Sequence, residues 1–539
     1  MQYVNFDKTM AYQQLAGHAA AWKGFDFRAH LDAERVRQCQ APMAAGLTYS
    51  WAAKAVDSGA LKLLQALADE QELIAKYTAL LNGEVVNTGE KRKVLHQLLR
   101  GECGGRGQPV TENGRNIGEF YRGELRRFGD FAEAVHKGTF KGSTGKPFTT
   151  VVQIGIGGSD LGPRALYLAL ENWAAAERSS SKAEIKMLKA QFISNVDPDD
   201  ASAVIASLPL DQSLFVLVSK SGTTQETLAN ELFVKDKLHK AGLDSSKHMV
   251  AVTSETSPLA RNPAYLDSFY IDDYIGGRYS SSSAVGGCIL SLAFGPAAFR
   301  ELLAGAAEAD KMALEPDILK NAALLDAAIG VWERNFLGYP YTAVLPYSQA
   351  LSRFPAHLQQ LDMESNGKRV NRDGQPIMYN TGPVVFGEPG TNGQHSFFQL
   401  LHQGTSIVPL QFIGFTESQK GDDVAVDGSV SQTKLNANLA AQIVAFAKGQ
   451  QASDASNLNK DFPGGRPSSL IYGKRLTPAA LGSLLAHFEN KVMFQGFMWN
   501  INSFDQEGVQ LGKILTKKVL SGNSGDPALD AYSHMLGIS

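Results

Sequence analysis

Cysteine is scarce in this chain, which has three thiols in 539 residues, at Cys39, Cys103 and Cys288. Their odd number and wide spacing fit neither the disulfide framework of a small secreted domain nor the paired spacing of a zinc site. The amino-terminal residues also lack the basic start and the apolar centre of a secretory signal. We therefore expect a protein of a reducing compartment, the cytoplasm.

The chain has neither a strong charge excess nor a long apolar run. Its 51 Lys and Arg residues are balanced by 54 Asp and Glu residues, which leaves a formal net charge of -3. This balance lacks the basic surface that binds nucleic acids or anionic membranes. No apolar run approaches the roughly 18 residues needed to cross a bilayer. We therefore expect neither nucleic acid nor a membrane as a partner.

The residues that are present are typical of a large globular protein. Hydrophobic residues make up 44% of the chain and charged residues 19%. This composition favours buried cores over disorder. The length is sufficient for two to four domains, at roughly 150 residues for each domain.

Two series of short apolar runs, each run followed by a helical stretch, come after a mainly helical region at residues 1–125. The first series lies in residues 126–300 and the second in 301–520, and residues 521–539 form a tail. Runs that are apolar at nearly every position indicate strands buried on both faces. Strand–helix alternation favours parallel sheets. The expected fold is α/β, with two tandem doubly wound sandwiches, a helical N-terminal region and a C-terminal helical arm.

A turn rich in hydroxyl groups follows one of the buried runs. Residues 219–227 read Ser-Lys-Ser-Gly-Thr-Thr-Gln-Glu-Thr, directly after the apolar residues 213–218. Hydroxyl groups, the N–H groups of a helix start and one ammonium together match a phosphate. Ser and Thr are also common N-caps, and Gly is a common turn residue. On this segment alone, an anion site and a plain strand-to-helix turn are both open.

A glycine-rich turn at residues 155–160 resembles a dinucleotide fingerprint, but Asp160 stands where the third Gly is needed. A carboxylate there would face the pyrophosphate, so nicotinamide and flavin binding are disfavoured. Residues 142–147 are similarly an incomplete P-loop, because Phe140 and Pro147 replace the required Gly and Ser or Thr. A small-ligand turn and a simple tight turn both remain open for 155–160.

Four further residues have side chains suited to proton transfer. Arg278 lies between a Gly pair and a run of Ser, although an arbitrary Arg is more often a solvated surface residue. Glu364 lies near Met and Leu at an expected helix end, which suits a general base, although most Glu residues are on the surface. His395 is expected just inside a helix start, where imidazole stays neutral. Lys513 is one lysine among many, and His402 is interpreted as a packing or capping residue.

The motifs contain no recognisable metal site and no nucleophile elbow. The histidines lack Cys or carboxylate partners at ligand spacing, and the serines lack the pattern of a hydrolase. The remaining set is an anion turn with one carboxylate, one imidazole, one guanidinium and one ammonium. This set predicts proton transfer on a phosphorylated metabolite, with no metal and no cofactor.

Five segments together, in this order, resemble the phosphoglucose isomerase family. They are the residues 155–163, 219–227, 276–286, 363–368 together with 390–404, and 504–513. The family has two sugar-isomerase domains, acts as a homodimer with shared active sites, and interconverts glucose 6-phosphate and fructose 6-phosphate in glycolysis and gluconeogenesis. The resemblance therefore implies an aldose–ketose isomerase with these substrates.

The resemblance also implies roles for individual residues. Glu364 matches the base that moves a proton between C2 and C1, and Arg278 matches the residue that stabilises the enediolate. His395, from the neighbouring subunit, and Lys513 match the pair that opens the sugar ring. The expected substrate-binding residues are Gly158, Ser159, Ser219, Lys220, Ser221, Gly222, Thr223, Thr224 and Gln360.

This chain departs from the family pattern near Lys513. Gln510 stands where Glu is usual, and the two positions are neighbours on a helix. A charged partner for the ammonium group of Lys513 is therefore missing at that position. Glu507 also replaces a bulkier residue, and nothing in the sequence explains it.

Two alternatives to this function remain. One is an isomerase of another sugar phosphate, such as mannose 6-phosphate, which would differ in its contacts to the C2 hydroxyl. The other is a non-catalytic sugar-phosphate sensor. A sensor would keep the hydroxyl turn but has no need of Glu364, Arg278, His395 and Lys513 together.

Overall fold

The computed structural model describes residues 1–22, 26–101, 109–180, 187–454, 456–522 and 524–538. Contacts between residues divide the chain into a large unit, Met1–Ser503, and a C-terminal unit, Phe504–Ser539. Each unit is described by itself. The predicted domain limits at residues 125, 300 and 520 stay predictions.

The first sheet of the large unit has five parallel strands in the order β11-β10-β9-β7-β8. Every residue of β7, β9 and β10 is buried, as uninterrupted apolar runs predict. Within this sheet β7 comes first along the chain, and it lies between β8 and β9, the next two strands. The strand order therefore reverses between β7 and β9. The bounds are β7 Thr150–Ile154, β8 Lys189–Ile193, β9 Ser213–Val218, β10 Met249–Thr253 and β11 Ser268–Tyr270.

The second sheet has six strands in the order β1-β2-β17-β14-β12-β13. Four strands are parallel, and two short antiparallel strands, β1 and β2, come from the mainly helical N-terminal region. A strand of three residues is too short to show the alternation of apolar and polar side chains by which strands are predicted. The edge strand β1 also ends in a Pro, which disfavours a strand prediction. The bounds are β1 Gln40–Pro42, β2 Thr48–Ser50, β12 Tyr341–Tyr347, β13 Val384–Phe386, β14 Leu410–Phe415 and β17 Ser468–Gly473.

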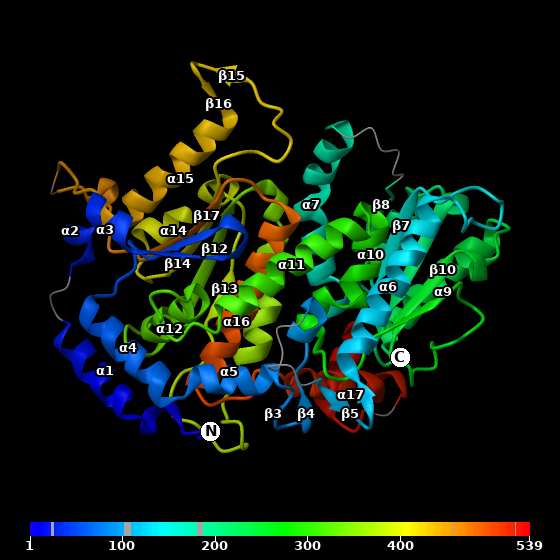
Figure 1. Ribbon diagram of the computed structural model, residues 1–539, viewed down its shortest axis with the longest axis horizontal. Helices are drawn as coiled ribbons and strands as arrows, with labels where there is room; N and C mark the ends of the chain where they lie inside the picture. The colour runs from blue at the N-terminus through cyan, green and yellow to red at the C-terminus, as the bar shows by residue number, and fades with distance from the viewer. Residues whose placement is uncertain (23–25, 102–108, 181–186, 455, 523, 539) are drawn as a thin grey trace. The chain divides into compact units, whose positions relative to one another are not determined.

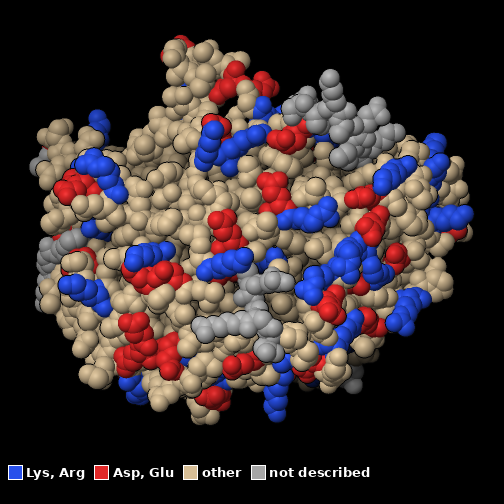
Figure 2. All heavy atoms as spheres, in the orientation of Figure 1, with Lys and Arg blue, Asp and Glu red and all other residues tan. Residues whose placement is uncertain are grey.

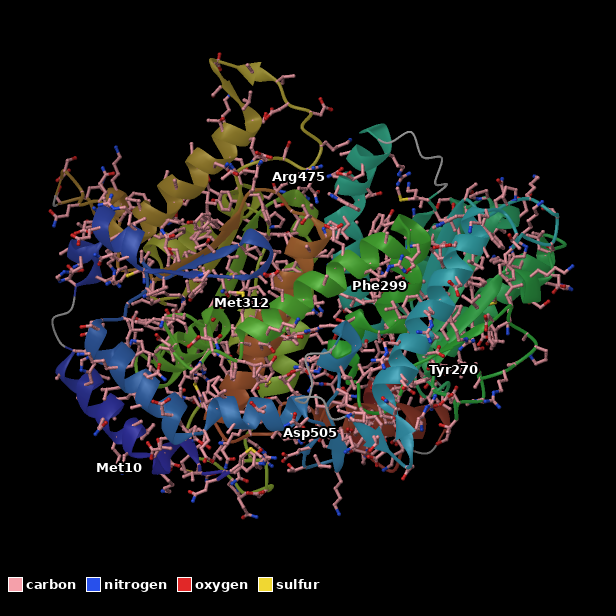
Figure 3. All side chains as sticks on the ribbon, viewed as in Figure 1. Met10, Tyr270, Phe299, Met312, Arg475 and Asp505 are labelled. Carbon is pink, nitrogen blue, oxygen red and sulfur yellow. The ribbon has the colours of Figure 1, made fainter. Side chains whose placement is uncertain are left out.

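Helices α11 (Pro296–Met312) and α16 (Pro478–Met498) pack along each other between the two sheets (Figure 1). They approach closely through glycines, because a Cβ on Gly482 would lie 1.9 Å from the carbonyl oxygen of Leu302. Phe299 and Met312 lie on α11 (Figure 3). Helix α16 is buried along its length, which explains its apolar residues on all sides. The parallel sheets and the helices confirm the α/β class predicted from the sequence.

Besides the two sheets, the structure describes helices and short hairpins in the large unit. The helices are α1 Met10–Ala21, α2 Phe27–His30, α3 Ala33–Gln38, α4 Ser58–Glu70, α5 Leu73–Leu81, α6 Ile117–His136, α7 Leu161–Ser180, α8 Pro198–Ala206, α9 Gln225–Lys240, α10 Ala284–Phe294, α11 Pro296–Met312, α12 Ala322–Asn335, α13 Phe354–Gln359, α14 Phe398–Gln403, α15 Ser431–Lys448 and α16 Pro478–Met498. The hairpins pair β3 Val85–Asn87 with β4 Arg92–Lys93, β5 Thr111–Glu112 with β6 Arg115–Asn116, and β15 Ala425–Val426 with β16 Ser429–Val430.

The C-terminal unit contains two helices, α17 Gln510–Leu520 and α18 Pro527–Met535. A short 3-10 turn, Glu507–Val509, comes before α17. Asp526 caps α18 through hydrogen bonds that its carboxylate accepts from the backbone N–H groups of Ala528 and Leu529. The side chain cap therefore sets the start of the last helix.

The surface charges and the free thiols are those expected from a nearly balanced charge composition and from few cysteines. Figure 2 shows acidic and basic side chains interspersed over one face. Cys39 and Cys288 are free thiols, and Cys103 lies outside the described residues. Within the described ranges, each helix is too short or too polar to cross a bilayer.

Candidate active site

The two polar turns predicted from the sequence follow neighbouring strands. Residues 155–160 come directly after β7, residues 219–224 come directly after β9, and these two strands pair in parallel. Parallel α/β sheets bind ligands beyond the carboxyl ends of the strands where the strand order reverses. The fold therefore brings Gly158 and Ser159 to the same edge of the sheet as the turn that begins at Ser219.

The turn after β9 is held by its own hydroxyl groups. The Ser219 hydroxyl accepts a hydrogen bond from the backbone N–H of Gly222 (3.1 Å) and donates to Thr224 Oγ1 (3.2 Å). The Ser221 hydroxyl accepts from both the N–H and the O–H of Thr223 (3.2 and 2.9 Å). These bonds fix the conformation of the turn, so its polar groups are arranged before a ligand arrives.

Helix α9 begins at this turn. Thr224 is its N-cap residue, but the Thr224 hydroxyl makes no capping bond. The first N–H groups of a helix have no partner within the helix, and together with the helix dipole they favour an anion. The 16-residue length of α9 and the two hydroxyls near its start support the anion site that the sequence left open.

Lys220 supplies a positive charge beside the turn. Its ammonium group donates to the carbonyl oxygen of Ile275 (3.3 Å) and lies 3.6 Å from the carboxylate of Asp273. The side chain is about one-third exposed. The lysine therefore extends toward the loop that leads to Arg278.

Two glycines are required by close contacts at the site. A Cβ on Gly158 would lie 2.3 Å from the carbonyl group of Gly277, so the turn after β7 packs directly on the turn that carries Arg278. Gly222 has a φ of +67°, and its Cβ would lie 2.2 Å from the hydroxyl oxygen of Ser257. Any side chain at either position would displace the neighbouring backbone or hydroxyl group.

Arg278 is buried, with 1% of its surface exposed, so its interpretation as a solvated surface residue is wrong. Its Nε donates to the Ser365 hydroxyl (2.6 Å) and its Nη2 to the carbonyl oxygen of Ser503 (2.6 Å). Its Nη1 lies 3.6 Å from Glu364 Oε2. Residues 86 positions apart in the sequence thus form one ion pair, and Ser365, which the sequence analysis did not single out, orients the guanidinium.

Glu364 ends a π-helical turn, Gln360–Glu364, that continues helix α13. Such turns occur often at functional sites. The Glu364 side chain is 21% exposed, and its Oε2 has no hydrogen-bond partner among the described residues. The carboxylate is therefore held near one cation but not enclosed by donors, which suits a group that must accept a proton.

Gln360 begins the same π-helical turn. Its amide lies beside the turn after β7, because a Cβ on Gly157 would be 3.4 Å from Gln360 Nε2. The Gln360 Oε1 is buried without a hydrogen-bond partner among the described residues. The structure thus brings Gln360 close to the predicted sugar contacts.

His395 is exposed and ends a 3-10 turn, Asn392–His395, so the prediction that it lies just inside a helix start is wrong. Helix α14 begins only at Phe398, where the phenyl ring enters the core of the second sheet. Packing of that ring, rather than the polar residues before it, decides where the helix starts. The packing role predicted for His402 is confirmed, since its ring stacks on Phe446 with the ring centres 3.7 Å apart.

Lys513 is exposed on α17 of the C-terminal unit. It is therefore not among the residues that the large unit brings together. Gln510 lies three positions earlier on the same helix, and Glu507 lies in the preceding 3-10 turn. Both are also exposed.

Asp160, which argued against dinucleotide binding, is buried and paired with Arg164 at 2.8 Å. Burial raises its pKa, and the neighbouring guanidinium opposes that rise. Within the described residues, no three His, Cys, Asp or Glu side chains are grouped as a metal site requires.

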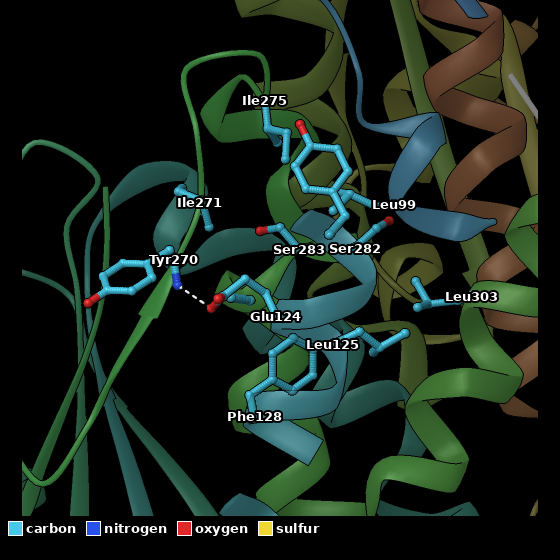
Figure 4. A pocket seen from close by; sticks show the side chains of 12 residues that line it. Leu99, Glu124, Leu125, Phe128, Tyr270, Ile271, Ile275, Ser282, Ser283 and Leu303 are labelled. Carbon is cyan, nitrogen blue, oxygen red and sulfur yellow. Dashed lines mark hydrogen bonds between the residues drawn. The ribbon is translucent and has the colours of Figure 1, made fainter. Parts of the chain in front are cut away.

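A separate small cavity of about 10 Å³ lies between helix α6 and the residues around 270–284 of the large unit (Figure 4). Its lining is mainly apolar, and the carboxylate of Glu124 accepts a hydrogen bond from the backbone N–H of Tyr270 (2.7 Å). No predicted site residue lines this cavity. It is therefore not part of the candidate site.

Comparison with known proteins agrees with the resemblance carried by the motifs. Residues 50–534 match the family described as phosphoglucose isomerase. A glucose-6-phosphate isomerase of Treponema denticola is 59% identical over 99% of this chain and 100% of its own length, and one of Treponema pallidum is 59% identical over 100% and 99%. A solved structure of a Chlamydia trachomatis glucose-6-phosphate isomerase is 42% identical, with a TM-score of 0.90 over 99% of this chain and 100% of that one. The chain therefore belongs to the phosphoglucose isomerase family.

Proposed function

We propose that this protein is a glucose-6-phosphate isomerase, which interconverts D-glucose 6-phosphate and D-fructose 6-phosphate in glycolysis and gluconeogenesis. The family and the relatives' names support the reaction. The observation that carries it is the ion pair between Glu364 and the buried Arg278, next to turns at the edge where the strand order reverses. The proposed compartment is the cytoplasm.

The phosphate group binds at the turn after β9 in this proposal. The N–H groups at the start of α9, the hydroxyls and Lys220 together supply hydrogen bonds and positive charge. Binding energy gained at the phosphate then holds the distant carbons C1 and C2 against the catalytic groups. The proposed contacts are Ser219, Lys220, Ser221, Gly222, Thr223 and Thr224, with Gly158, Ser159 and Gln360 at the sugar.

Ring opening comes first, because only a small fraction of a hexose phosphate is open-chain. A proton must leave the O1 hydroxyl and another must reach the ring oxygen as the C1–O5 bond breaks. We assign these transfers to His395 and Lys513. Each such group typically contributes about 10²–10⁴-fold to the rate.

Glu364 then removes the proton from C2 of the open aldose. The electron pair of the C2–H bond forms the C1–C2 double bond, and negative charge develops on O1. Arg278 stabilises this enediolate, because a buried guanidinium interacts strongly with developing charge. A proton then passes from the O2 hydroxyl to O1, and Glu364 returns its proton to C1 as C2 and O2 become the carbonyl group, which gives the ketose without a metal or a redox cofactor.

A homodimer is part of the proposal, with His395 contributed by the neighbouring subunit. His395 is exposed on its own chain, as a residue that serves another subunit must be. The two remaining alternatives, action on mannose 6-phosphate and a non-catalytic sensor, are outcomes of the assays below.

Isotope exchange tests the reaction. The purified protein and fructose 6-phosphate in D₂O are expected to yield glucose 6-phosphate carrying deuterium at C2, measured by NMR, because the proton on Glu364 exchanges with solvent. Mannose 6-phosphate is assayed in parallel. A protein that binds the sugars but exchanges no hydrogen would be a sensor, and the proposal would be wrong.

The matched variant is Glu364→Gln, which keeps the size of the side chain but cannot accept the proton. We expect kcat to fall by at least about 10³-fold while KM changes little, since the interaction lost is made mainly in the transition state. Glu133→Gln, at an exposed glutamate on α6, is the control and should retain full activity. Normal turnover by Glu364→Gln would exclude this residue as the base.

A further inference from the structure

Asp362 lies in the middle of the π-helical turn that ends at Glu364, and it has no assigned role. The residue is buried, with 7% of its surface exposed. Its Oδ1 has no hydrogen-bond partner among the described residues. A buried carboxyl oxygen without a partner is costly, so its surroundings require an explanation.

The surroundings are two small cavities, each of about 20 Å³. Both are lined by Asp362 together with Thr342, Gln411 and Lys491. A cavity of at least about 10–15 Å³ with two to four polar partners can hold one ordered water molecule. The space beside Asp362 therefore has both the size and the polar lining that an internal water requires.

The charged groups around the cavities already have partners of their own. The ammonium of Lys54 contacts both carboxylate oxygens of Glu333 (3.0 and 2.9 Å). Lys491 lies 3.1 Å from Asp326, and so does the ring of His487. Asp362 is in none of these pairs. Its Oδ1 therefore needs a hydrogen-bond donor other than these side chains' direct contacts.

Two polar groups can share a water with Asp362. Lys491 Nζ donates to Gln411 Oε1 (3.1 Å), and Gln411 Nε2 donates to Asp326 Oδ2 (2.6 Å). An ammonium group has three N–H donors, so Lys491 retains donor capacity after these contacts. Burial raises the pKa of Asp362 to about 7, and Lys491 opposes that rise.

The residues after Glu364 are anchored from the other side. Ser365 accepts a hydrogen bond from Arg278 (2.6 Å). The side chain of Asn366 donates to the carbonyl oxygen of Val492 (3.0 Å), and Lys368 donates to the carbonyl oxygen of Glu364 (2.8 Å). Asp362 is the polar side chain of the turn that faces the cavities before Glu364.

We propose that an internal water in these cavities joins Asp362 to Lys491 and Gln411, and that Asp362 is thereby a positioning residue for Glu364. The inference rests on the proposed function, in which Glu364 is the base. A π-helical turn is a local insertion in the α-helical repeat, and in this proposal its side-chain anchors set where Glu364 points. A displacement of about 1 Å can lower the rate of an enzyme about 10²-fold.

The test compares Asp362→Leu with Asp362→Asn. Leucine fills the cavity and cannot bind water, so we expect kcat to fall about 10- to 100-fold with KM within about twofold, because the phosphate turn is untouched. Its Tm should not fall, since a buried carboxyl group is removed. Asparagine keeps the size and the hydrogen-bonding groups, and should retain kcat within about threefold. A kcat of Asp362→Leu within twofold of the parent, or an equal loss in Asp362→Asn, would overturn the positioning role.

A high-resolution crystal structure of the unaltered protein and of Asp362→Asn gives a readout that does not depend on catalysis. An ordered water within hydrogen-bond distance of residue 362 and of Lys491 or Gln411 is expected in both. Density without such a water would overturn the bridge, even if Asp362→Leu failed to fold. Glu364→Gln in the same assays separates the two proposals, because full activity of that variant contradicts the proposed base and leaves the water result standing.

Discussion

At the scale of single residues, burial decides which side chains can serve the chemistry. Arg278 has hydrogen bonds to Ser365 and to the carbonyl oxygen of Ser503, so its guanidinium is fixed before substrate arrives. In the proposed reaction, a fixed cation does not need to reorganise as the enediolate forms, which is the main advantage of a preorganised site. The neighbouring Gly and Ser residues in the sequence indicated this role only weakly, because they do not show what covers the side chain.

Asp362 makes the stability of the fold depend on pH. Its pKa is about 7 in the folded protein and near the ordinary value of 3.8 in the unfolded chain. Between these values the folded state holds a proton that the unfolded state has lost, so this group's contribution to stability decreases as pH rises through that window. The other titratable groups that line the cavities are Lys54, Asp326, Glu333, Arg334, Tyr339, Tyr341 and Lys491, and His487 contacts Asp326.

We therefore expect Asp362→Asn, which does not titrate, to gain stability relative to the parent as pH rises. The difference in Tm between variant and parent should be small at pH 4.5 and clearly larger at pH 8, measured by thermal unfolding at both values. The surface variant Asp236→Asn on α9, where the pKa lies below its ordinary value, is the control and should show no such gain. A constant difference for Asp362→Asn would contradict the raised pKa.

At the scale of elements, short turns between strand and helix form most of the site. The turn after β9 combines a buried Ser219, a Gly222 with positive φ and the uncapped start of α9. The shape of this turn depends on hydrogen bonds within residues 219–224. Such local bonds follow from the Ser, Thr and Gly residues of the segment, so the turn can be predicted from the sequence. The π-helical turn before Ser365 is different, because helical periodicity gave no sign of the extra residue in its turn.

We expect Gly222→Ala to weaken phosphate binding. Its Cβ would meet the Ser257 hydroxyl at 2.2 Å and the φ of +67° would be strained, so the turn must shift. KM for fructose 6-phosphate and the inhibition constant of inorganic phosphate should both rise about tenfold or more, with a smaller change in kcat. Steady-state kinetics with phosphate as inhibitor measures both.

The control is Gly242→Ala, just after the C-terminal end of the same helix. Gly242 also has a positive φ, of +73°, but its Cβ would meet nothing within 4 Å. This variant carries the same backbone strain without disturbing the turn after β9. It should lose stability but keep the parent's KM for fructose 6-phosphate and inhibition constant of inorganic phosphate. Equal effects of the two variants would show that strain alone explains the loss.

At the scale of the whole molecule, two sheets and the helices between them bring distant segments into one site. The turn after β7 and the turn that carries Arg278 touch at Gly158 and Gly277, more than 100 residues apart in the chain. This contact requires the first sheet to be formed, because both turns follow strands of that sheet, β7 and β11.

A mixture of two inactive variants tests the shared site. His395→Ala and Glu364→Gln are each expected to be inactive alone, but a hybrid dimer would have one intact site, because each subunit supplies the residue that the other lacks. Random mixing after subunit exchange should restore about a quarter of the parent activity, since half of the dimers are hybrid and each has one of two sites intact. Subunit exchange is verified with two different affinity tags. Proven exchange without recovery would place His395 in the same subunit as Glu364.

The sequence by itself determined the α/β class and the family, because these follow from residue type, local spacing and turn chemistry, and it supplied the candidate side chains for phosphate binding and proton transfer. Only the tertiary structure decided that Arg278 is buried and lies beside Glu364, that β1 and β2 extend the second sheet, and that Glu364 ends a π-helical turn whose Asp362 lines two small cavities. These features depend on packing between segments far apart in the chain, and local periodicity carries no information about which distant partner a side chain will meet.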